Sequence, residues 1–207
     1  MHFEEDYTYH IYNRSNQKIF FNRDNYLFFL SKIRVHILPL TDILAYCLMT
    51  NHFHLLVKVN NKGIEYINEK HRNNTQVLSK QIGVMLSAYT QAINKQEGLK
   101  GSLFAHKTNA KQLNFTTNFK NPSSLKNVTN YNYARNCFLY IHQNPKESGL
   151  VEKLEDWEFS SFRDYTGLRE GTLINKDLAF EIIGLDKETF YQQSYISLDD
   201  SDIKEIW

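Results

Sequence analysis

Two strand-like runs in close succession constrain the fold of this chain more than any other feature of its sequence. Residues 43–49 (ILAYCLM) and 53–59 (FHLLVKV) are rich in apolar residues, and the break between them centres on Thr50 and Asn51. Short apolar runs of this kind are typical of buried strands. Because so short a connection leaves no room for a crossover, we expect the two strands to pair in antiparallel fashion.

Segments of regular pattern flank this pair of strands. The sequence predicts a strand over 7–14, a helix from Asp24 to about Val35, a helix over 76–95 that stops at Gly98, a fourth strand that starts within 101–105, and a helix over 131–143 that ends at Asn144-Pro145. The order β-α-β-β-α-β, followed by another helix, predicts an α+β fold with a ferredoxin-like antiparallel β-sheet and helices on one face.

The remaining segments set the expected domain organisation. Residues 60–74 and 107–130 are polar and are expected to be irregular. We assign residues 1–150 to one domain and residues 151–207 to a C-terminal helical tail that packs on or near it.

Composition narrows the class of protein. The 207 residues suit one domain with a tail, and 14 Phe and 13 Tyr supply ample surface for a core. Two cysteines exclude a disulfide framework, the first ten residues are too polar for a signal peptide, and no apolar run reaches the roughly 20 residues of a membrane span. We therefore expect a cytoplasmic protein with no membrane partner. A formal net charge of +1 disfavours nucleic-acid binding through bulk charge but permits a local basic patch.

Two histidines stand in the second of the central strands. His52 and His54 are two residues apart, so their side chains share one face of a strand. Two imidazoles on one face form half of a site for a divalent metal ion. The alternative is a pair of unrelated histidines on either side of a buried Phe53, and the spacing alone does not separate the two interpretations.

A second candidate constellation lies in the last predicted helix. Tyr140 and Asn144 are four residues apart and therefore share one face of that helix. A tyrosine beside a metal-binding amide could present a nucleophile to a metal-bound substrate. The alternative is a tyrosine in the core and an asparagine that caps the helix before Pro145, and for this pair taken alone the alternative is favoured.

Together the two constellations resemble a known family. The chain resembles the Y1 HUH-type transposases of the IS200/IS605 class, and most closely their REP-associated tyrosine transposase (RAYT) relatives. The resemblance spans about residues 7–166, and the ordered set of blocks is more specific than any single block. The blocks are Tyr9-His10-Ile11-Tyr12-Asn13-Arg14-Ser15, 45–57 (AYCLMTNHFHLLV), 101–104 (GSLF), 140–145 (YIHQNP), 149–151 (GLV) and 157–162 (WEFSSF).

The resemblance implies an HUH endonuclease fold and a mechanism. His52 and His54 would bind a divalent metal ion, Mg²⁺ or Mn²⁺, with Asn144 as third ligand and Gln143 as its competitor. Tyr140 would attack a phosphate of single-stranded DNA at or near a hairpin, forming a 5′-phosphotyrosine and a free 3′-OH. His142 is given no role. Relatives work as homodimers or as monomers, so both states are expected.

Nucleic-acid contacts are expected from seven residues, although for each of them taken alone an ordinary solvated surface side chain is the favoured interpretation: Asn13, Arg14, Lys18, Lys58, Lys107, Lys111 and Arg163. The chain departs from the family at Ser15, where relatives often carry Gly, at 105–108 (AHKT), where relatives show an Arg-aromatic-Lys run, and at Lys146. The altered loop motivates an alternative function, a domesticated nucleic-acid-binding module without catalysis.

Overall fold

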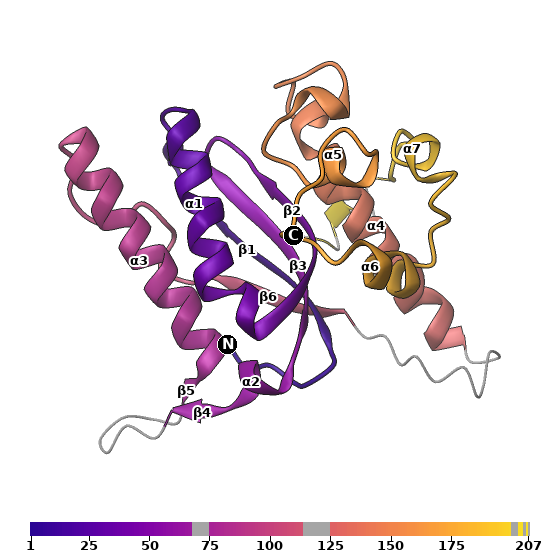
Figure 1. Ribbon diagram of the computed structural model, residues 1–207, viewed down its shortest axis with the longest axis horizontal. Coiled ribbons are helices and arrows are strands. Elements are labelled where there is room, and N and C mark those ends of the chain that lie inside the picture. The colour runs from indigo at the N-terminus through magenta and orange to yellow at the C-terminus, as the bar shows by residue number, and fades with distance from the viewer. Residues whose placement is uncertain (68–74, 114–124, 200–202, 205, 207) are drawn as a thin grey trace.

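A four-stranded antiparallel sheet in the order β2-β3-β1-β6 forms the centre of the computed structural model (Figure 1). The structure describes residues 1–67, 75–113, 125–199, 203, 204 and 206. The sheet strands are β1 (Thr8–Arg14), β2 (Thr41–Leu48), β3 (His52–Val59) and β6 (Asn109–Leu113), and β4 (Tyr66–Ile67) pairs with β5 (Thr75–Gln76) in a separate ribbon. The predicted ferredoxin-like α+β sheet, with its antiparallel central pair, is confirmed.

Two long helices cover one face of the sheet, as predicted. They are α1 (Arg23–His36) and α3 (Val77–Glu97), and the short elements α2 (Asn61–Ile64) and η1 (Leu38–Leu40) lie beside them. Asn22 caps α1 by accepting a hydrogen bond from the backbone of Asn25, while Asp24 lies inside the first turn. Gly98 ends α3 in the left-handed conformation (φ 65°), which glycine adopts without strain.

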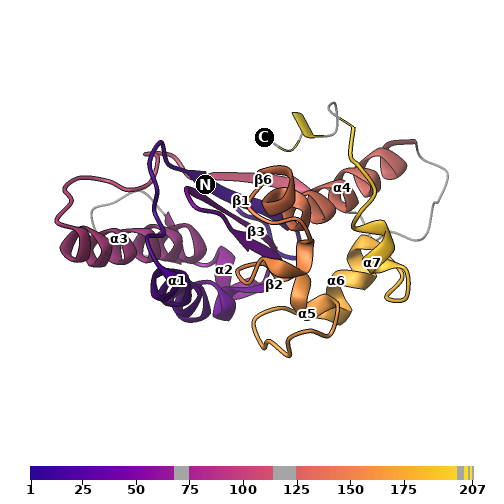
Figure 2. The same cartoon turned by 90° about the horizontal axis from the view of Figure 1, so that it is seen from above.

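The last long helix and the tail cover the opposite face of the sheet (Figure 2). They comprise α4 (Leu125–Glu147), with side chains described from Tyr133 onward, η2 (Leu154–Asp156), α5 (Phe162–Tyr165), α6 (Lys176–Ile183) and α7 (Phe190–Gln193). Within the described residues, no helix is both long enough and apolar enough to cross a membrane. The sheet therefore has a core on each side.

Strict alternation along β3 separates these two cores. Phe53, Leu55 and Val57 pack towards α1 and α3, whereas Leu56 packs with residues of α4. Since side chains of a strand alternate between faces, His52 and His54 must lie on the α4 side with Leu56. The period of β3 thus decides which helix the histidines meet.

The tail closes the β2 edge of the sheet. The Leu48 amide donates to the Phe159 carbonyl, the Ser161 amide donates to the Tyr46 carbonyl, and Cys47 forms an isolated antiparallel bridge with Ser160. Leu154, Phe162 and other tail residues are buried in the same core as α4. These contacts place the tail on residues 1–150, and its helices complete the second core.

The fourth strand differs from the prediction. Residues 101–105 form no strand, because Leu103 and Phe104 are buried in the core under α1 and α3 and do not alternate between two faces. The strand is β6, inside a segment expected to be irregular, and residues 125–130 of that segment belong to α4. The sequence of β6, NAKQL, lacks β-branched residues, so pairing with β1 decides its conformation. Residues 68–74 and 114–124 lie outside the described residues.

Candidate functional site

Strands β1 and β3 bring three histidines together on the α4 side of the sheet. In the antiparallel register Tyr12 lies opposite His54, and His10 lies opposite Leu56. His10 Nε2 lies 2.8 Å from His54 Nδ1, and their rings stack with centroids 5.0 Å apart. The rings of His52 and His54 are also 5.0 Å apart and nearly perpendicular.

Burial keeps these imidazoles neutral. Burial holds the pKa of His54 well below its usual value, and so do the repulsion that it would meet from His10 and His52 if all three were protonated and the charge of Arg14. Burial and Arg14 lower the pKa of His52 to about 4, against an opposing hydrogen bond from Asn144. Their nitrogen lone pairs are therefore available at neutral pH, as metal binding requires.

Helix α4 places Tyr140 and Asn144 against this histidine pair. Asn144 Nδ2 lies 3.0 Å from His54 Nε2, and the Tyr140 ring meets the His54 ring edge to face at 5.7 Å and 88°. Cys137, Phe138 and other apolar residues of α4 are buried against the sheet and fix the helix in this position. The two constellations that the sequence showed about 90 residues apart thus form one cluster.

The neighbouring amide, Gln143, points elsewhere. Its Nε2 donates to the carbonyls of Ser194 and Ile196 in the tail, at 2.9 and 2.8 Å. Of the two amides that the sequence left in competition, the one beside His54 is Asn144. His142, one residue earlier, also faces the tail, where its Nε2 lies 2.8 Å from Ser161 Oγ.

His10 is a member of the cluster for which the sequence predicts no role. It is fully buried between Tyr12 and His54. Burial and the charge of Lys111 lower its pKa to about 3, partly offset by the backbone of Ile206. If His54 Nε2 offers its lone pair to a metal, His54 Nδ1 carries the proton and donates to His10 Nε2. The residue two positions before Tyr12 shares its strand face, but only the β1–β3 register reveals the contact.

The donor set of the cluster fits a divalent cation. It offers two neutral imidazoles and one amide, whose oxygen and nitrogen exchange by a simple flip of the Asn144 side chain. In the present orientation Asn144 Oδ1 accepts from Ser148 Oγ at 3.3 Å. Within the described residues no group of three or more His, Cys, Asp or Glu is arranged around a metal position. Water or substrate oxygens would have to complete the coordination.

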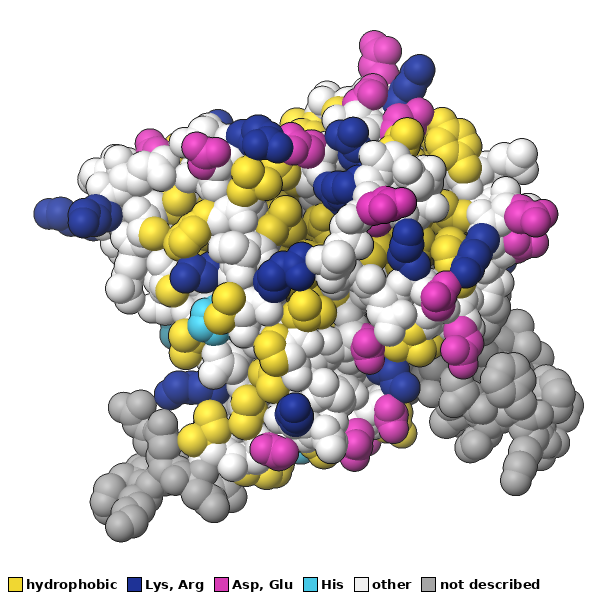
Figure 3. All heavy atoms as spheres, viewed as in Figure 1, with side chains coloured by type: hydrophobic (Ala, Val, Ile, Leu, Met, Phe, Trp, Pro, Cys, Tyr) yellow, Lys and Arg dark blue, Asp and Glu magenta, His cyan; other side chains and the backbone are white. Residues whose placement is uncertain are grey.

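Two of the predicted basic contacts, Arg14 and Lys111, lie near the cluster, and a third, Lys107, lines a pocket together with Tyr12. Arg14 is exposed at the end of β1 opposite His52, whose pKa it helps to lower. Lys107 precedes β6 and Lys111 belongs to it, and both side chains are exposed. Across the face in Figure 3, Lys and Arg side chains are interspersed with Asp and Glu, so that face carries no broad field of one sign.

The other predicted contacts are placed differently. Asn13 is fully buried, and its amide donates to the Ala105 carbonyl and Thr108 Oγ1, so it holds the 105–108 segment in place. Lys58 pairs with Asp6 at 2.9 Å, six residues along β3 from His52. Lys18 is exposed and donates to the Phe21 carbonyl. Arg163 lies on α5, next to the β2 edge, on the side of the sheet away from β6.

The fold and the cluster together define a class: a ferredoxin-like sheet with a histidine pair facing a helix-borne tyrosine and asparagine. No family model and no curated protein matches the chain. Among solved structures it is similar to that of a REP-associated tyrosine transposase bound to a REP hairpin, with a TM-score of 0.55 and 15% identity over 81% of this chain and 83% of that chain. The chain therefore shares the fold of this transposase.

Proposed function

We propose that this protein is a metal-dependent single-strand DNA endonuclease and strand transferase of the transposase type. One observation carries the proposal: Tyr140 and Asn144 on α4 meet the neutral His52/His54 pair on β3. The fold shared with a transposase solved on a hairpin supports DNA as the substrate. The positive residues Arg14 and Lys111 near the cluster support a nucleic-acid backbone as the ligand.

Each residue of the cluster has a distinct role in this reaction. His52, His54 and Asn144 would hold a divalent cation, Mg²⁺ or Mn²⁺, which supplies positive charge to polarise the scissile phosphate. Tyr140 Oη forms a bond to phosphorus while the bond from phosphorus to the 3′ oxygen breaks. Tyr140 loses its proton as it attacks, and the departing 3′ oxygen gains one. The products are a 5′-phosphotyrosine and a free 3′-OH. Attack by another 3′-OH then breaks the bond between Tyr140 and phosphorus and joins the two DNA ends.

The decisive variant removes only the attacking oxygen. Tyr140→Phe is expected to abolish both cleavage and the covalent DNA adduct while it leaves hairpin binding within about two-fold of wild type, because the phenyl ring keeps the packing on His54. Denaturing gels with end-labelled single-stranded hairpins measure cleavage and adduct, and fluorescence anisotropy measures binding. A covalent adduct that persists in Tyr140→Phe would refute the assignment of the nucleophile.

The alternative function is nucleic-acid binding without catalysis. It is favoured by the 105–108 loop, AHKT, which lacks the Arg-aromatic-Lys run expected from the resemblance, and by the net charge of +1. A library of labelled hairpins incubated with Mg²⁺ and with Mn²⁺ separates the two functions. Binding without nicking in either metal supports the alternative, whereas metal-dependent nicking supports the nuclease.

A further inference from the structure

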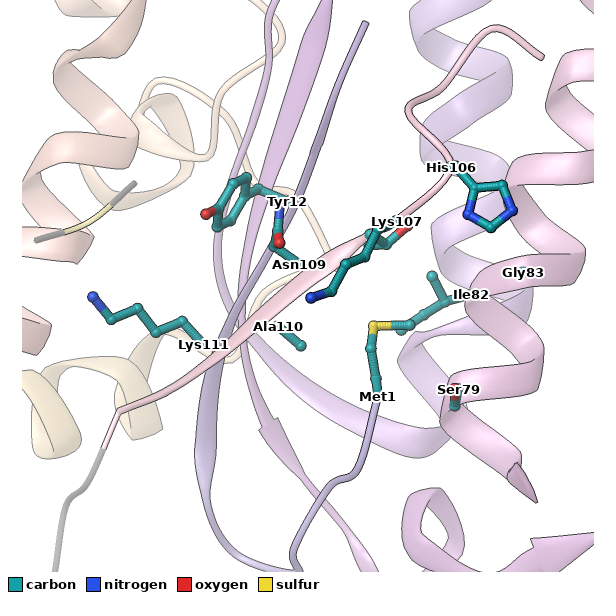
Figure 4. Close-up of a pocket in the computed structure, with 11 residues that line it drawn as sticks. Met1, Tyr12, Ser79, Ile82, Gly83, His106, Lys107, Asn109, Ala110 and Lys111 are labelled. Atoms are coloured by element: carbon teal, nitrogen blue, oxygen red, sulfur yellow. The ribbon is translucent and has the colours of Figure 1, made fainter. Parts of the chain in front are cut away.

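A pocket of about 750 Å³ lies along the outer side of β6, where the strand faces α3. Its size is within the range of sites that enclose small ligands or single nucleotides. Figure 4 shows Tyr12 and Lys111 on one side of β6, and Met1, Ile82 and His106 on the other. Lys107, Thr108, Asn109 and Ser79 are further polar residues of the lining. The pocket thus follows an edge strand and includes residues of both sheet faces.

The lining of this pocket includes basic residues and no acidic residue. The basic residues are Lys107, Lys111 and His106. The molecule as a whole is almost neutral, with 24 Lys and Arg against 23 Asp and Glu. A local excess of cations in a near-neutral protein is complementary to a polyanion such as a nucleic-acid backbone.

The pocket borders the proposed catalytic cluster at Tyr12. Tyr12, in its lining, stacks on His10 at 4.8 Å and lies 5.9 Å from the His54 ring, centroid to centroid. Lys111 lies with its Nζ 4.6 Å above the Tyr133 ring of α4, and its charge helps to lower the pKa of His10. Ring contacts therefore link the pocket to Tyr140, because Tyr12 lies beside His54 and His54 meets Tyr140.

The two edges of the sheet differ in their backbone partners. The tail bonds to the backbone of β2 and closes that edge. β6 pairs with β1 on one side and, among the described residues, with no strand on the other. Polar groups along an edge strand are available to a ligand that lies against them.

We propose that the pocket along β6 binds the single-stranded segment that leads into the scissile phosphate, and that it does not bind the duplex stem of the hairpin. Lys107 and Lys111 bind phosphates, and Tyr12, Asn109 and Ile82 line the space that an unpaired base enters. The lining comes from the edge strand β6 with the segment before it and from one helix, α3, together with Met1 and Tyr12, and offers two lysines to a single strand. This inference rests on the proposed function, because it assigns part of that function's substrate.

The test compares two DNA probes in EDTA, where no metal-dependent cleavage takes place. The probes are a fluorescein-labelled 12-nucleotide single strand of mixed sequence and a blunt hairpin without overhangs. We expect the double variant Lys107→Gln/Lys111→Gln to bind the single strand at least about ten-fold more weakly, with a log–log salt slope smaller by about 1.4, and to bind the blunt hairpin as wild type does. Lys95→Gln, at the exposed end of α3 and outside the pocket, is the charge control.

A second variant fills the pocket without removing charge. A side chain at Gly83, in the α3 wall, meets nothing within 4 Å, so Gly83→Met extends into open space and suits a helix. Gly83→Met is expected to weaken binding of the single-stranded probe several-fold. Val84→Met changes the next residue, which lies outside this pocket, and is expected to leave that binding unchanged.

The outcomes separate the pocket from the proposed function. Unchanged single-strand affinity in both pocket variants, or an equal loss for the blunt hairpin, would overturn the pocket assignment and leave the nuclease proposal standing. A wild-type protein that binds neither probe would overturn the proposed function and the pocket with it.

Discussion

At the residue scale, the contact between His10 and His54 determines how the proposed metal ligand is held. The 2.8 Å contact between His10 Nε2 and His54 Nδ1 fixes the ring of His54 and leaves its Nε2 towards Asn144. Partners of this kind orient a ligand and raise its basicity. His10 therefore acts as a positioning residue.

Substitution of His10 tests this role. His10→Phe keeps an aromatic ring but offers no acceptor, so Mn²⁺ affinity should fall about 10–100-fold. His10→Gln offers an amide oxygen to His54 and should recover part of that loss. Calorimetric titration with Mn²⁺ measures the affinity, and Tyr140→Phe, which removes no ligand, is the matched control. Equal Mn²⁺ affinities in wild type and His10→Phe would argue against the role.

At the scale of elements, one serine ties three of them together. Ser161 Oγ accepts from the Tyr46 amide of β2 at 2.9 Å and lies 2.8 Å from His142 Nε2 of α4. The residue itself belongs to the tail segment at the β2 edge and is fully buried. The position of α4, and so of Tyr140, depends on this junction.

Removal of the Ser161 hydroxyl is expected to be costly. Ser161→Ala leaves the Tyr46 amide and His142 Nε2 without this partner in a buried place, and should lower the free energy of unfolding by about 1–3 kcal/mol. Urea denaturation followed by circular dichroism measures the change. The control is Ser31→Ala, whose hydroxyl donates to the Phe28 carbonyl on an exposed part of α1; its effect should stay within about 0.5 kcal/mol. Equal effects of the two variants would show that the Ser161 hydroxyl does not stabilise the contact between β2, α4 and the tail.

Elements also differ in how far the sequence predicts them. The apolar periodicity of α3, and the strand patterns of β1, β2 and β3, were sufficient because each carries its own buried face. β6 is a polar edge strand that forms by pairing with β1. Leu103 and Phe104 are apolar and so favour the prediction of a strand, but both are buried in the core outside any strand. Local pattern fails where a segment's conformation is imposed by its partner.

At the scale of the whole molecule, buried neutral histidines couple stability to pH. Burial lowers the pKa of His142 to about 3, of His10 to about 3 and of His52 to about 4. In the unfolded chain a histidine titrates near pH 6.5. As the pH falls from about 7 towards 4, these histidines bind protons in the unfolded chain but stay neutral in the folded protein. The free energy of unfolding therefore falls.

We therefore expect the urea midpoint to be clearly lower at pH 5.0 than at pH 7.5. The carboxyl groups with lowered pKa, Glu155 and Glu158, add little in this window because they titrate below it. His142→Gln, which can still bond to Ser161 Oγ, should reduce the dependence on pH. An identical midpoint at both pH values would show that these histidines do not set the acid limit.

Local periods of two and of 3.6 residues are enough to predict most of the main helices and strands, the shared strand face of His52 and His54 and the shared helix face of Tyr140 and Asn144. The packed fold is needed to show that these faces meet, that His10 contacts His54, that Gln143 bonds to the tail and that Asn13 holds a loop. The physical reason is that contacts across the sheet depend on strand register and helix packing, and neither is written in a local pattern.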